Sequence, residues 1–246
     1  MQPAISSVVL SFIVPAYNEE RLLGQTLESI HSAARDIGEP YEVIVADDGS
    51  TDQTALVAQS HGAFVVKVNH RKISATRNSG AKVATGDFFF FVDADTVVDT
   101  EVVQTALKTM RGGAVGGGAA FKFDGVTPWY ARLMLPIIML LFRWTGIATG
   151  CFLFCTKTAF LAVGGFDEAY FGAEEIVLSK ALRRHGRFKV LRHSVTTSGR
   201  KLRTFSNREV MTMLMRIARR GRGGVKQRQG MELWYGDRRD DPKQEG

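Results

Sequence analysis

Apolar and polar positions alternate along the first hundred residues in two distinct rhythms. Short continuous apolar runs occupy residues 8–14, 41–46, 63–68 and 88–92. Between them, apolar residues recur at helical spacing over residues 22–30, 54–60 and 73–84. Runs this short predict strands buried on both faces, and strands that alternate with helices predict a wound, mainly parallel sheet. The sequence therefore predicts an α/β fold with helices on both faces of the sheet.

Polar residues directly follow three of these predicted strands. They are Tyr17 after the first strand, Asp47 and Asp48 after the second, and Asp93 and Asp95 after the phenylalanine-rich run. Carboxyl ends of parallel strands meet at one edge of a sheet, so we expect these side chains to line one crevice. Two carboxylates one residue apart repel unless a cation lies between them, which favours Mg²⁺ or Mn²⁺ and a phosphate-bearing substrate. The alternative is that the last two aspartates only end the strand and cap the next helix.

Two further segments bear on the shape of the molecule. Residues 112–118 contain five glycines and predict a loop or an irregular edge strand. Residues 129–142 are nearly all apolar, with Arg132 and Arg143 near the ends. The uncharged stretch 133–142 falls well short of the about 20 residues that span a bilayer. We expect a core helix or an interfacial helix there.

The basic residues are concentrated in one part of the chain. Residues 1–182 contain 14 Lys and Arg against 19 Asp and Glu, whereas residues 183–228 contain 15 against a single Glu. A capping box at residues 206–209 predicts a helix from Val210 to Arg220, with Met and Leu on one face and Arg on the other. Such a stretch favours an anionic partner, which could be membrane lipid, bound phosphate or nucleic acid. Because no nucleic-acid-binding signature is present, we expect no nucleic-acid partner.

Two features bear on where the protein works. The first apolar run begins within ten residues of Met1, which leaves no room for a signal peptide. Cys151 and Cys155 lie in an apolar run, which is more typical of reduced core residues than of a disulfide or a metal site. We therefore expect a cytoplasmic protein. The basic stretch and residues 133–142 predict peripheral contact with anionic lipid at the inner face of the cell membrane. The alternative is that these two stretches pack against each other and that their arginines are only solvated.

Six short blocks, in order, give the sequence a family resemblance. They are residues 14–19 (VPAYNE), 45–52 (VADDGSTD), 75–80 (ATRNSG), 91–95 (FVDAD), 164–168 (GGFDE) and 174–178 (EEIVL). On these motifs the chain resembles the family 2 glycosyltransferases of the GT-A fold, over about three quarters of its length. Six ordered blocks are specific for the family but not for the sugar that is moved.

The resemblance implies a nucleotide-sugar donor site whose residues follow by position. The donor-binding residues would be Pro15, Ala16, Tyr17, Glu19, Asp47, Asp48, Arg77 and Asp93. Pro15 and Tyr17 would border the nucleotide base, and Asp48 would hydrogen-bond it. Arg77 would steady the diphosphate.

The resemblance also implies a metal ion and a general base. Asp95 would ligate the Mg²⁺ or Mn²⁺ that bridges the diphosphate, with Asp93 near the ribose and the metal. In inverting members the second carboxylate of a Glu-Asp pair deprotonates the acceptor, and here Glu175 holds that position, with its neighbour Glu174 as the alternative catalytic carboxylate. Glu in place of Asp is a departure, because the extra methylene moves the carboxylate by more than an ångström. His193 is the nearest candidate for a late metal-binding histidine, although a solvated histidine at a strand edge fits its context better.

The predicted function is metal-dependent, inverting transfer of a sugar from a UDP- or GDP-linked donor. The acceptor would be the hydroxyl of a polyol, a cell-envelope glycan or a lipid-linked compound. The residues favour this chemistry, because a metal can neutralise the leaving diphosphate while a downstream carboxylate takes the acceptor proton. Two alternatives stay open: a nucleotide-sugar-binding module without turnover, and a nucleotidyltransferase that releases pyrophosphate. We expect the catalytic domain at residues 1–200 and a basic helical extension at 201–246.

Overall fold

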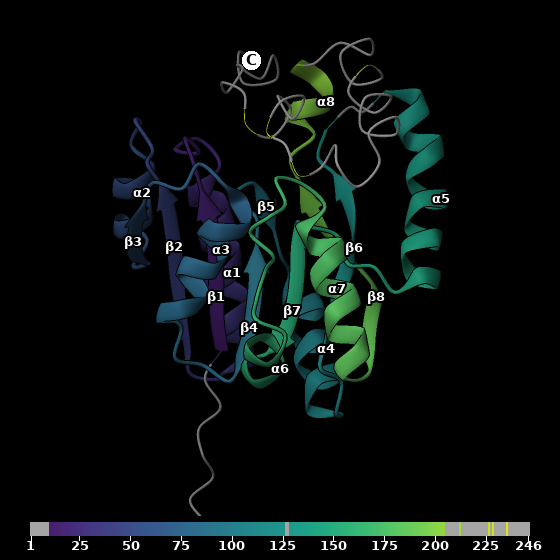
Figure 1. Ribbon diagram of the computed structural model, residues 1–246. Helices are drawn as coiled ribbons and strands as arrows, with labels where there is room; N and C mark the ends of the chain where they lie inside the picture. Colours follow the sequence, from purple (N-terminus) through teal and green to yellow (C-terminus); the bar gives the residue numbers. More distant parts are fainter. Residues whose placement is uncertain are drawn as a thin grey trace, which may run out of the picture.

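A computed structural model of the chain describes residues 10–125 and 128–204, together with residues 212, 226, 228 and 235 (Figure 1). The strands are β1 (Leu10–Ala16), β2 (Tyr41–Asp48), β3 (Phe64–Val68), β4 (Phe88–Val92), β5 (Thr96–Val97), β6 (Gly116–Phe123), β7 (Phe152–Thr156) and β8 (Phe188–Thr197). The helices are α1 (Leu23–Ile37), α2 (Thr54–Ser60), α3 (Ile73–Val83), α4 (Thr100–Arg111), α5 (Trp129–Thr145), α6 (Lys157–Ala162), α7 (Glu174–His185) and α8 (Arg200–Thr204). The predicted α/β fold is confirmed. The predicted helix from Val210 to Arg220 lies outside the described residues.

The strands form one mixed sheet in the order β3-β2-β1-β4-β7-β6-β8-β5. The first four strands in this order are parallel, as expected. Strand β7 runs antiparallel to both of its neighbours, and β5 runs antiparallel to β8. Strand β6 is again parallel to β8, so the sheet is mainly parallel, as predicted, with antiparallel exceptions at β7 and β5. An apolar run reports that a strand is buried, but it carries no information about strand direction.

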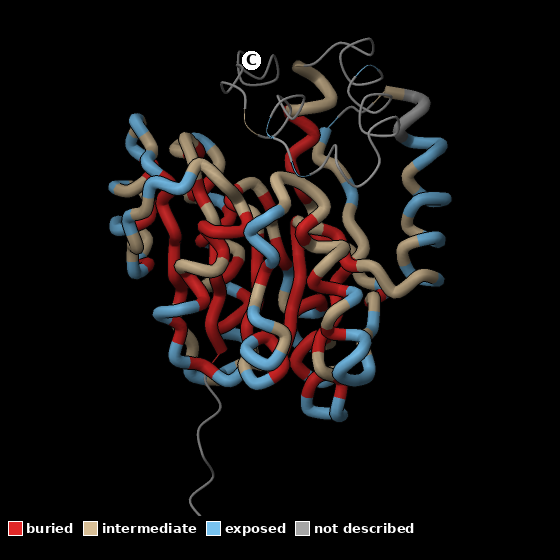
Figure 2. Tube along the Cα trace, in the orientation of Figure 1, coloured by how far each residue is buried: buried red, intermediate tan, exposed pale blue. Residues whose placement is uncertain are grey.

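Strand β4 lies in the interior of the sheet and is buried on both faces, as predicted. Phe89 and Phe91 pack on one face with residues of α3, α6 and α7. Phe90 packs on the other face, stacked on Phe12 with a centroid distance of 5.0 Å, in a core that includes residues of α1, α2 and α4. The result is a sheet between two helical layers, with the buried residues concentrated in the strands (Figure 2).

The prediction of a loop in the glycine-rich segment is confirmed for residues 112–115 and wrong for residues 116–118, which begin strand β6. Residues 116–118 pair with β7 on one side and β8 on the other, so they form an interior strand. A Cβ on Gly117 would overlap the Lys189 carbonyl oxygen and the Phe154 ring, and a Cβ on Gly118 would lie 2.5 Å from the Cβ of Ala148. Glycine is therefore required here for close approach rather than for flexibility.

Helix α5 stands at one edge of the molecule rather than in the core (Figure 1). It begins after Pro128, ends at Gly146 in the left-handed conformation, and exposes most of its large apolar side chains. The prediction of a core helix is therefore wrong, whereas the prediction of an interfacial helix stays open. Within the described part of the chain, no helix is long and apolar enough to cross a membrane.

The close packing of β6 predicts that Gly117→Ala destabilises the fold. The added methyl meets a backbone oxygen that cannot rotate away, so we expect the free energy of unfolding to fall by about 3 kcal/mol or more. Urea unfolding followed by circular dichroism measures this change. The control is Gly24→Ala on α1, where the nearest group is the rotatable His61 ring at 3.3 Å and alanine is the better helix former. Equal unfolding midpoints for the two variants would contradict this account of β6.

Candidate active site

A pocket opens at the carboxyl ends of β1, β2 and β4 and encloses about 690 Å³ of space, part of it open to solvent. Seven residues predicted from the sequence line it: Pro15, Ala16, Tyr17, Glu19, Asp48, Asp93 and Asp95. Arg71, Ile73, Thr76, Ala94, Lys201 and Tyr235 complete the lining. The three polar strand ends therefore meet in one crevice.

Asp48 organises one wall of the pocket. Its buried carboxylate accepts hydrogen bonds from the three backbone N–H groups of residues 70–72, at 2.6, 2.8 and 3.0 Å, and from the Thr76 hydroxyl at 2.8 Å. These contacts fix the turn before α3, where the guanidinium of Arg71 lies 3.5 Å from the ring centroid of Tyr17. Four contacts match the acceptor capacity of a carboxylate. Hydrogen bonding of Asp48 to a nucleotide base stays a prediction.

Asp47 lies next to Asp48 but does not line the pocket. Its buried carboxylate accepts a hydrogen bond from the Ser50 N–H at 3.1 Å, across a turn in which Gly49 has a φ of 72°. A positive φ favours glycine, so this turn explains why Gly49 follows the two aspartates. The contacts of Asp47 thus shape the loop after β2, and a donor contact stays a prediction.

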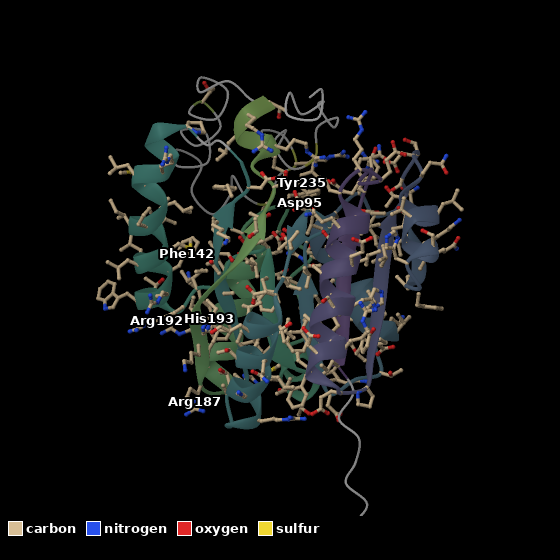
Figure 3. All side chains as sticks on the ribbon, turned by 180° about the vertical axis from the view of Figure 1, so that it is seen from behind. Asp95, Phe142, Arg187, Arg192, His193 and Tyr235 are labelled. Carbon is tan, nitrogen blue, oxygen red and sulfur yellow. The ribbon has the colours of Figure 1, made fainter. Side chains whose placement is uncertain are left out.

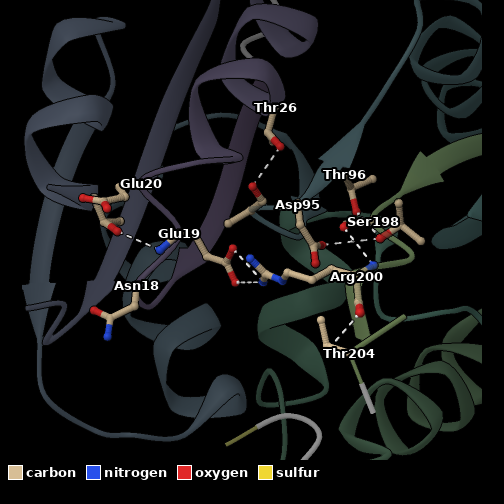
Figure 4. Close-up of polar contacts among 12 residues, drawn as sticks. Asn18, Glu19, Glu20, Thr26, Asp95, Thr96, Ser198, Arg200 and Thr204 are labelled. Atoms are coloured by element: carbon tan, nitrogen blue, oxygen red, sulfur yellow. Dashed lines mark hydrogen bonds and ion pairs between the residues drawn. The ribbon is translucent and has the colours of Figure 1, made fainter. Parts of the chain in front are cut away.

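Asp93 and Asp95 follow β4 and differ in what they contact. The Asp93 carboxylate accepts a hydrogen bond from Arg77 at 2.7 Å, and its side chain is 34% exposed. Asp95 receives a long hydrogen bond of 3.4 Å from the Thr197 hydroxyl, while its backbone carbonyl accepts from the Ser198 N–H at 3.0 Å (Figure 4). The Asp95 carboxylate therefore faces the pocket with much of its acceptor capacity available.

Asp95 and Asp93 fit a hard divalent ion that arrives with the donor. No group of three or more His, Cys, Asp or Glu side chains could hold a metal among the residues that the structure describes. A pair of carboxylates is nevertheless sufficient, because Mg²⁺ keeps several waters and takes its other ligands from substrate phosphates. His193 lies well away from Asp95 (Figure 3), with Nε2 2.9 Å from the Glu101 carboxylate.

Arg77 contacts Asp93 of the pocket lining and joins three segments of the chain. Its guanidinium donates to Glu174 at 2.8 Å, to Asp93 at 2.7 Å and to the Gly150 carbonyl oxygen at 3.0 Å. The side chain is 3% exposed, so burial lowers its pKa, but the charges of Asp93, Glu174 and Glu175 more than offset this and raise the pKa above its ordinary value. The geometry shows Arg77 orienting these carboxylates, and direct contact with the diphosphate stays a prediction.

Glu174 and Glu175 begin α7 in different surroundings. Glu174 is buried and paired with Arg77, whereas Glu175 is partly exposed as a residue although its carboxyl group is buried. Burial, and next the charge of Glu174, raise the pKa of Glu175 to about 8, although Arg77 opposes this rise. A carboxylate whose pKa lies near neutral pH is suited to accept a proton in a reaction. The role of general base stays a prediction for Glu175 and for Glu174.

Glu19 connects the pocket to a distant part of the chain. Arg200 donates to both carboxylate oxygens of Glu19, at 2.9 and 3.0 Å, and the two side chains are 10% and 5% exposed (Figure 4). The pair fastens α8 beside the loop that follows β1, so that Lys201 on α8 lines the pocket. A donor contact of Glu19 itself stays a prediction.

Three polar lining residues do not follow from the sequence motifs: Arg71, Lys201 and Tyr235. Their sequence signals are weak, since Arg71 lies in the basic tripeptide 70–72 and Lys201 in the long basic stretch. Tyr235 has no motif around it, yet its hydroxyl accepts a hydrogen bond from the Ile73 N–H at 3.3 Å. Residues that line the pocket therefore lie on both sides of the predicted boundary at residue 200, and the division into 1–200 and 201–246 stays a prediction.

Comparison with known proteins identifies the family of this chain. Residues 11–166 match the family model described as Glycosyl transferase family 2. The chain belongs to this family. A mannosyltransferase of known structure, PcManGT from Pyrobaculum calidifontis in complex with GDP-Man and Mn²⁺, aligns with a TM-score of 0.66 at 19% identity, over 83% of this chain and 59% of that chain. The fold of this glycosyltransferase is thus GT-A.

Curated relatives of this glycosyltransferase are longer than the chain itself. It is 28% identical over 221 residues to validoxylamine A glucosyltransferase of Streptomyces hygroscopicus subsp. limoneus, covering 72% of this chain and 48% of that protein. It is 31% identical over 152 residues to undecaprenyl-phosphate 4-deoxy-4-formamido-L-arabinose transferase of Serratia proteamaculans, covering 57% of this chain and 45% of that protein. The chain spans about half the length of these relatives.

The buried position of Arg77 predicts a large cost for Arg77→Met. Its removal leaves Glu174 buried without a counter-charge, so we expect the free energy of unfolding to fall by about 3–5 kcal/mol. The control is Arg111→Met, which breaks an ion pair of 2.7 Å with Glu39 on the surface. This change should lower the free energy of unfolding by about 0–1 kcal/mol. Urea unfolding of both variants measures the difference. Similar losses in both would show that burial does not set the importance of Arg77.

Proposed function

We propose that this glycosyltransferase moves a sugar from a UDP- or GDP-linked donor to an acceptor hydroxyl, with inversion at the anomeric carbon. The observation that carries the proposal is the network around Arg77. It joins Asp93 at the end of β4 to Glu174 at the start of α7. A leaving-group site and a proton acceptor are thereby held in one rigid unit. The GDP-Man and Mn²⁺ bound to PcManGT support a nucleoside diphosphate donor and a metal.

The donor would occupy the pocket with its diphosphate toward Asp95. The ring of Tyr17 and the guanidinium stacked on it provide a flat wall suited to a nucleotide base. Arg71 and Lys201 contribute positive charge to a lining that also contains three aspartates. A Mg²⁺ or Mn²⁺ ion held by Asp95 and Asp93 would neutralise the charge that develops on the departing diphosphate.

Glu175 would take the proton of the attacking acceptor hydroxyl. In an inverting displacement the acceptor oxygen bonds to the anomeric carbon from the face opposite the leaving diphosphate, so the base belongs on the acceptor side. Glu175 is the better candidate of the two glutamates, because Arg77 holds the carboxylate of Glu174. The raised pKa of Glu175 allows the carboxyl to retain the proton until solvent removes it.

The names of the relatives give only a broad indication of the acceptor class. Validoxylamine A and undecaprenyl phosphate appear in the names of two relatives, and they are chemically unlike each other. We propose a polyol, a cell-envelope glycan or a lipid-linked hydroxyl compound as the acceptor. Release of nucleoside diphosphate from a panel of nucleotide sugars, with Mn²⁺ and each acceptor class, tests the proposal. No release from any donor would support a binding module without turnover, and release of pyrophosphate would indicate a nucleotidyltransferase.

Glu175→Gln should lower turnover by ~10²–10⁴-fold with little change in donor affinity, because it keeps the shape of the side chain and removes the proton acceptor. Steady-state turnover and calorimetric donor binding measure the two effects. The wild-type rate should rise with pH through an apparent pKa near 8, the value for Glu175. The control is Glu174→Gln. An inactive Glu174→Gln beside a fully active Glu175→Gln would assign the base to Glu174.

Glu175→Gln, which should lower turnover, should raise the stability of the fold at alkaline pH. Since the pKa of Glu175 is raised from 4.5 to about 8 on folding, its ionisation opposes folding progressively between these values, and the full cost is present above pH 8. Glu175→Gln removes that cost. We expect a higher melting temperature than wild type at about pH 9 and a much smaller difference near about pH 5. Scanning calorimetry at both pH values tests this, and a pH-independent difference would contradict the raised pKa.

Asp95→Asn should abolish metal-dependent turnover and leave the fold intact, because it removes a charged ligand from a partly exposed position. Turnover is measured across a Mn²⁺ titration, with melting temperature as the check on folding. Thr197→Val is the matched control, since it deletes the hydroxyl that contacts Asp95 and keeps the carboxylate. Full activity of Asp95→Asn in excess chelator would exclude Asp95 as the metal ligand.

A further inference from the structure

Helix α5 (Trp129–Thr145) carries most of the exposed apolar surface of the described chain. Of the eleven large hydrophobic side chains that are exposed there, seven lie on this helix. The most exposed are Leu133 at 59%, Leu140 at 66% and Trp144 at 84%. Apolar side chains scattered singly over a surface are ordinary, but a concentration on one element indicates an interaction site.

The exposed side chains form one continuous face. Leu133, Ile137, Leu140 and Trp144 recur at intervals of four, three and four residues, which places them in one stripe along the helix. Phe142, on the side of α5 nearer the sheet, is only partly exposed (Figure 3). Helix α5 is therefore apolar toward the protein and also apolar toward its surroundings, and water is a poor partner for the outer face.

The charged residues of the segment that carries this face are all basic. Arg132 and Arg143 are exposed near the two ends of α5, and residues 125–166 contain no Asp or Glu. Strand β8, which packs beside α5, carries the exposed Arg192 close to the lower end of the helix in Figure 3. The apolar face is thus bordered by arginines without nearby acidic residues from its own segment.

This combination selects between possible occupants of the face. A second copy of the chain would bring two arginine borders together, and like charges across an interface oppose association. A bilayer with anionic headgroups satisfies both features, because apolar side chains enter the boundary between headgroups and acyl chains while arginines meet phosphates.

We propose that α5 is a docking helix that lies in the surface of an anionic membrane. Its exposed apolar face inserts into the headgroup boundary, and Arg132, Arg143 and Arg192 contact lipid phosphates. Docking by this helix holds the protein at the membrane without spanning it. The proposal concerns the outer face of the molecule and does not depend on the donor, the metal or the general base.

Co-sedimentation of the full chain with vesicles tests the proposal. We expect the chain to pellet with phosphatidylcholine vesicles that contain about one third phosphatidylglycerol, to remain in the supernatant with pure phosphatidylcholine, and to be released by salt. Equal sedimentation with both vesicle types, or none with either, would overturn the proposal.

Matched variants assign the binding to α5. Leu140→Ser with Trp144→Ser should lower the partition coefficient by about tenfold or more, whereas Leu56→Ser with Leu161→Ser, at leucines 61% and 63% exposed elsewhere, should leave it unchanged. Arg143→Gln with Arg192→Gln should weaken binding to anionic vesicles, and Lys82→Gln with Lys108→Gln, on other helices, should not.

Analytical ultracentrifugation of the same proteins tests whether a second copy of the chain covers this face instead. If the chain does not bind vesicles but forms a dimer, and if Leu140→Ser with Trp144→Ser disrupts that dimer, the face would be assigned to self-association.

Discussion

The site depends on the buried guanidinium of Arg77. Its positive charge must be compensated by carboxylates of the surrounding segments. Arg77 reaches across from α3 to the end of β4, the start of α7 and the loop at Gly150. The depth of Arg77 depends on Gly80 one turn later on the same helix, where a Cβ would lie 2.6 Å from Ile13 on β1. Close approach of helix to sheet therefore sets where the guanidinium lies, and the guanidinium sets where the carboxylates lie.

This arrangement separates the acidic residues of the site into two groups. Asp47, Asp48, Glu19 and Glu174 are buried, and their oxygens are used in contacts within the chain. Asp93 and Asp95 are partly exposed and line the pocket, and Asp95 receives a long hydrogen bond from the Thr197 hydroxyl. The first group holds the surrounding segments in place, and the second group lies at the surface of the pocket. A site can therefore contain many carboxylates and still present only a few of them to chemistry.

The sequence predicts strongly wherever one local pattern dominates. The phenylalanine run could only be a buried strand, and Asp93 and Asp95 follow from its end. Strand β6 was not predictable, because glycines at residues 116–118 resemble a loop until the neighbouring strands β7 and β8 are in place. The exposure of α5 was not predictable either, since apolar spacing looks the same against a core and against a membrane. The ion pairs of Arg77 and Glu19 were not predictable for another reason. Their partners lie 97 and 181 residues away, and no local sequence pattern indicates such pairs.

The ion pair between Glu19 and Arg200 has a consequence for the order of events during synthesis. A ribosome delivers the N-terminal residues first, and domains acquire contacts as the chain emerges. The first strands can pair early, but Glu19 must wait for a partner that is made 181 residues later. Strands β1 to β4 can therefore be complete while the pocket still lacks the wall that α8 provides.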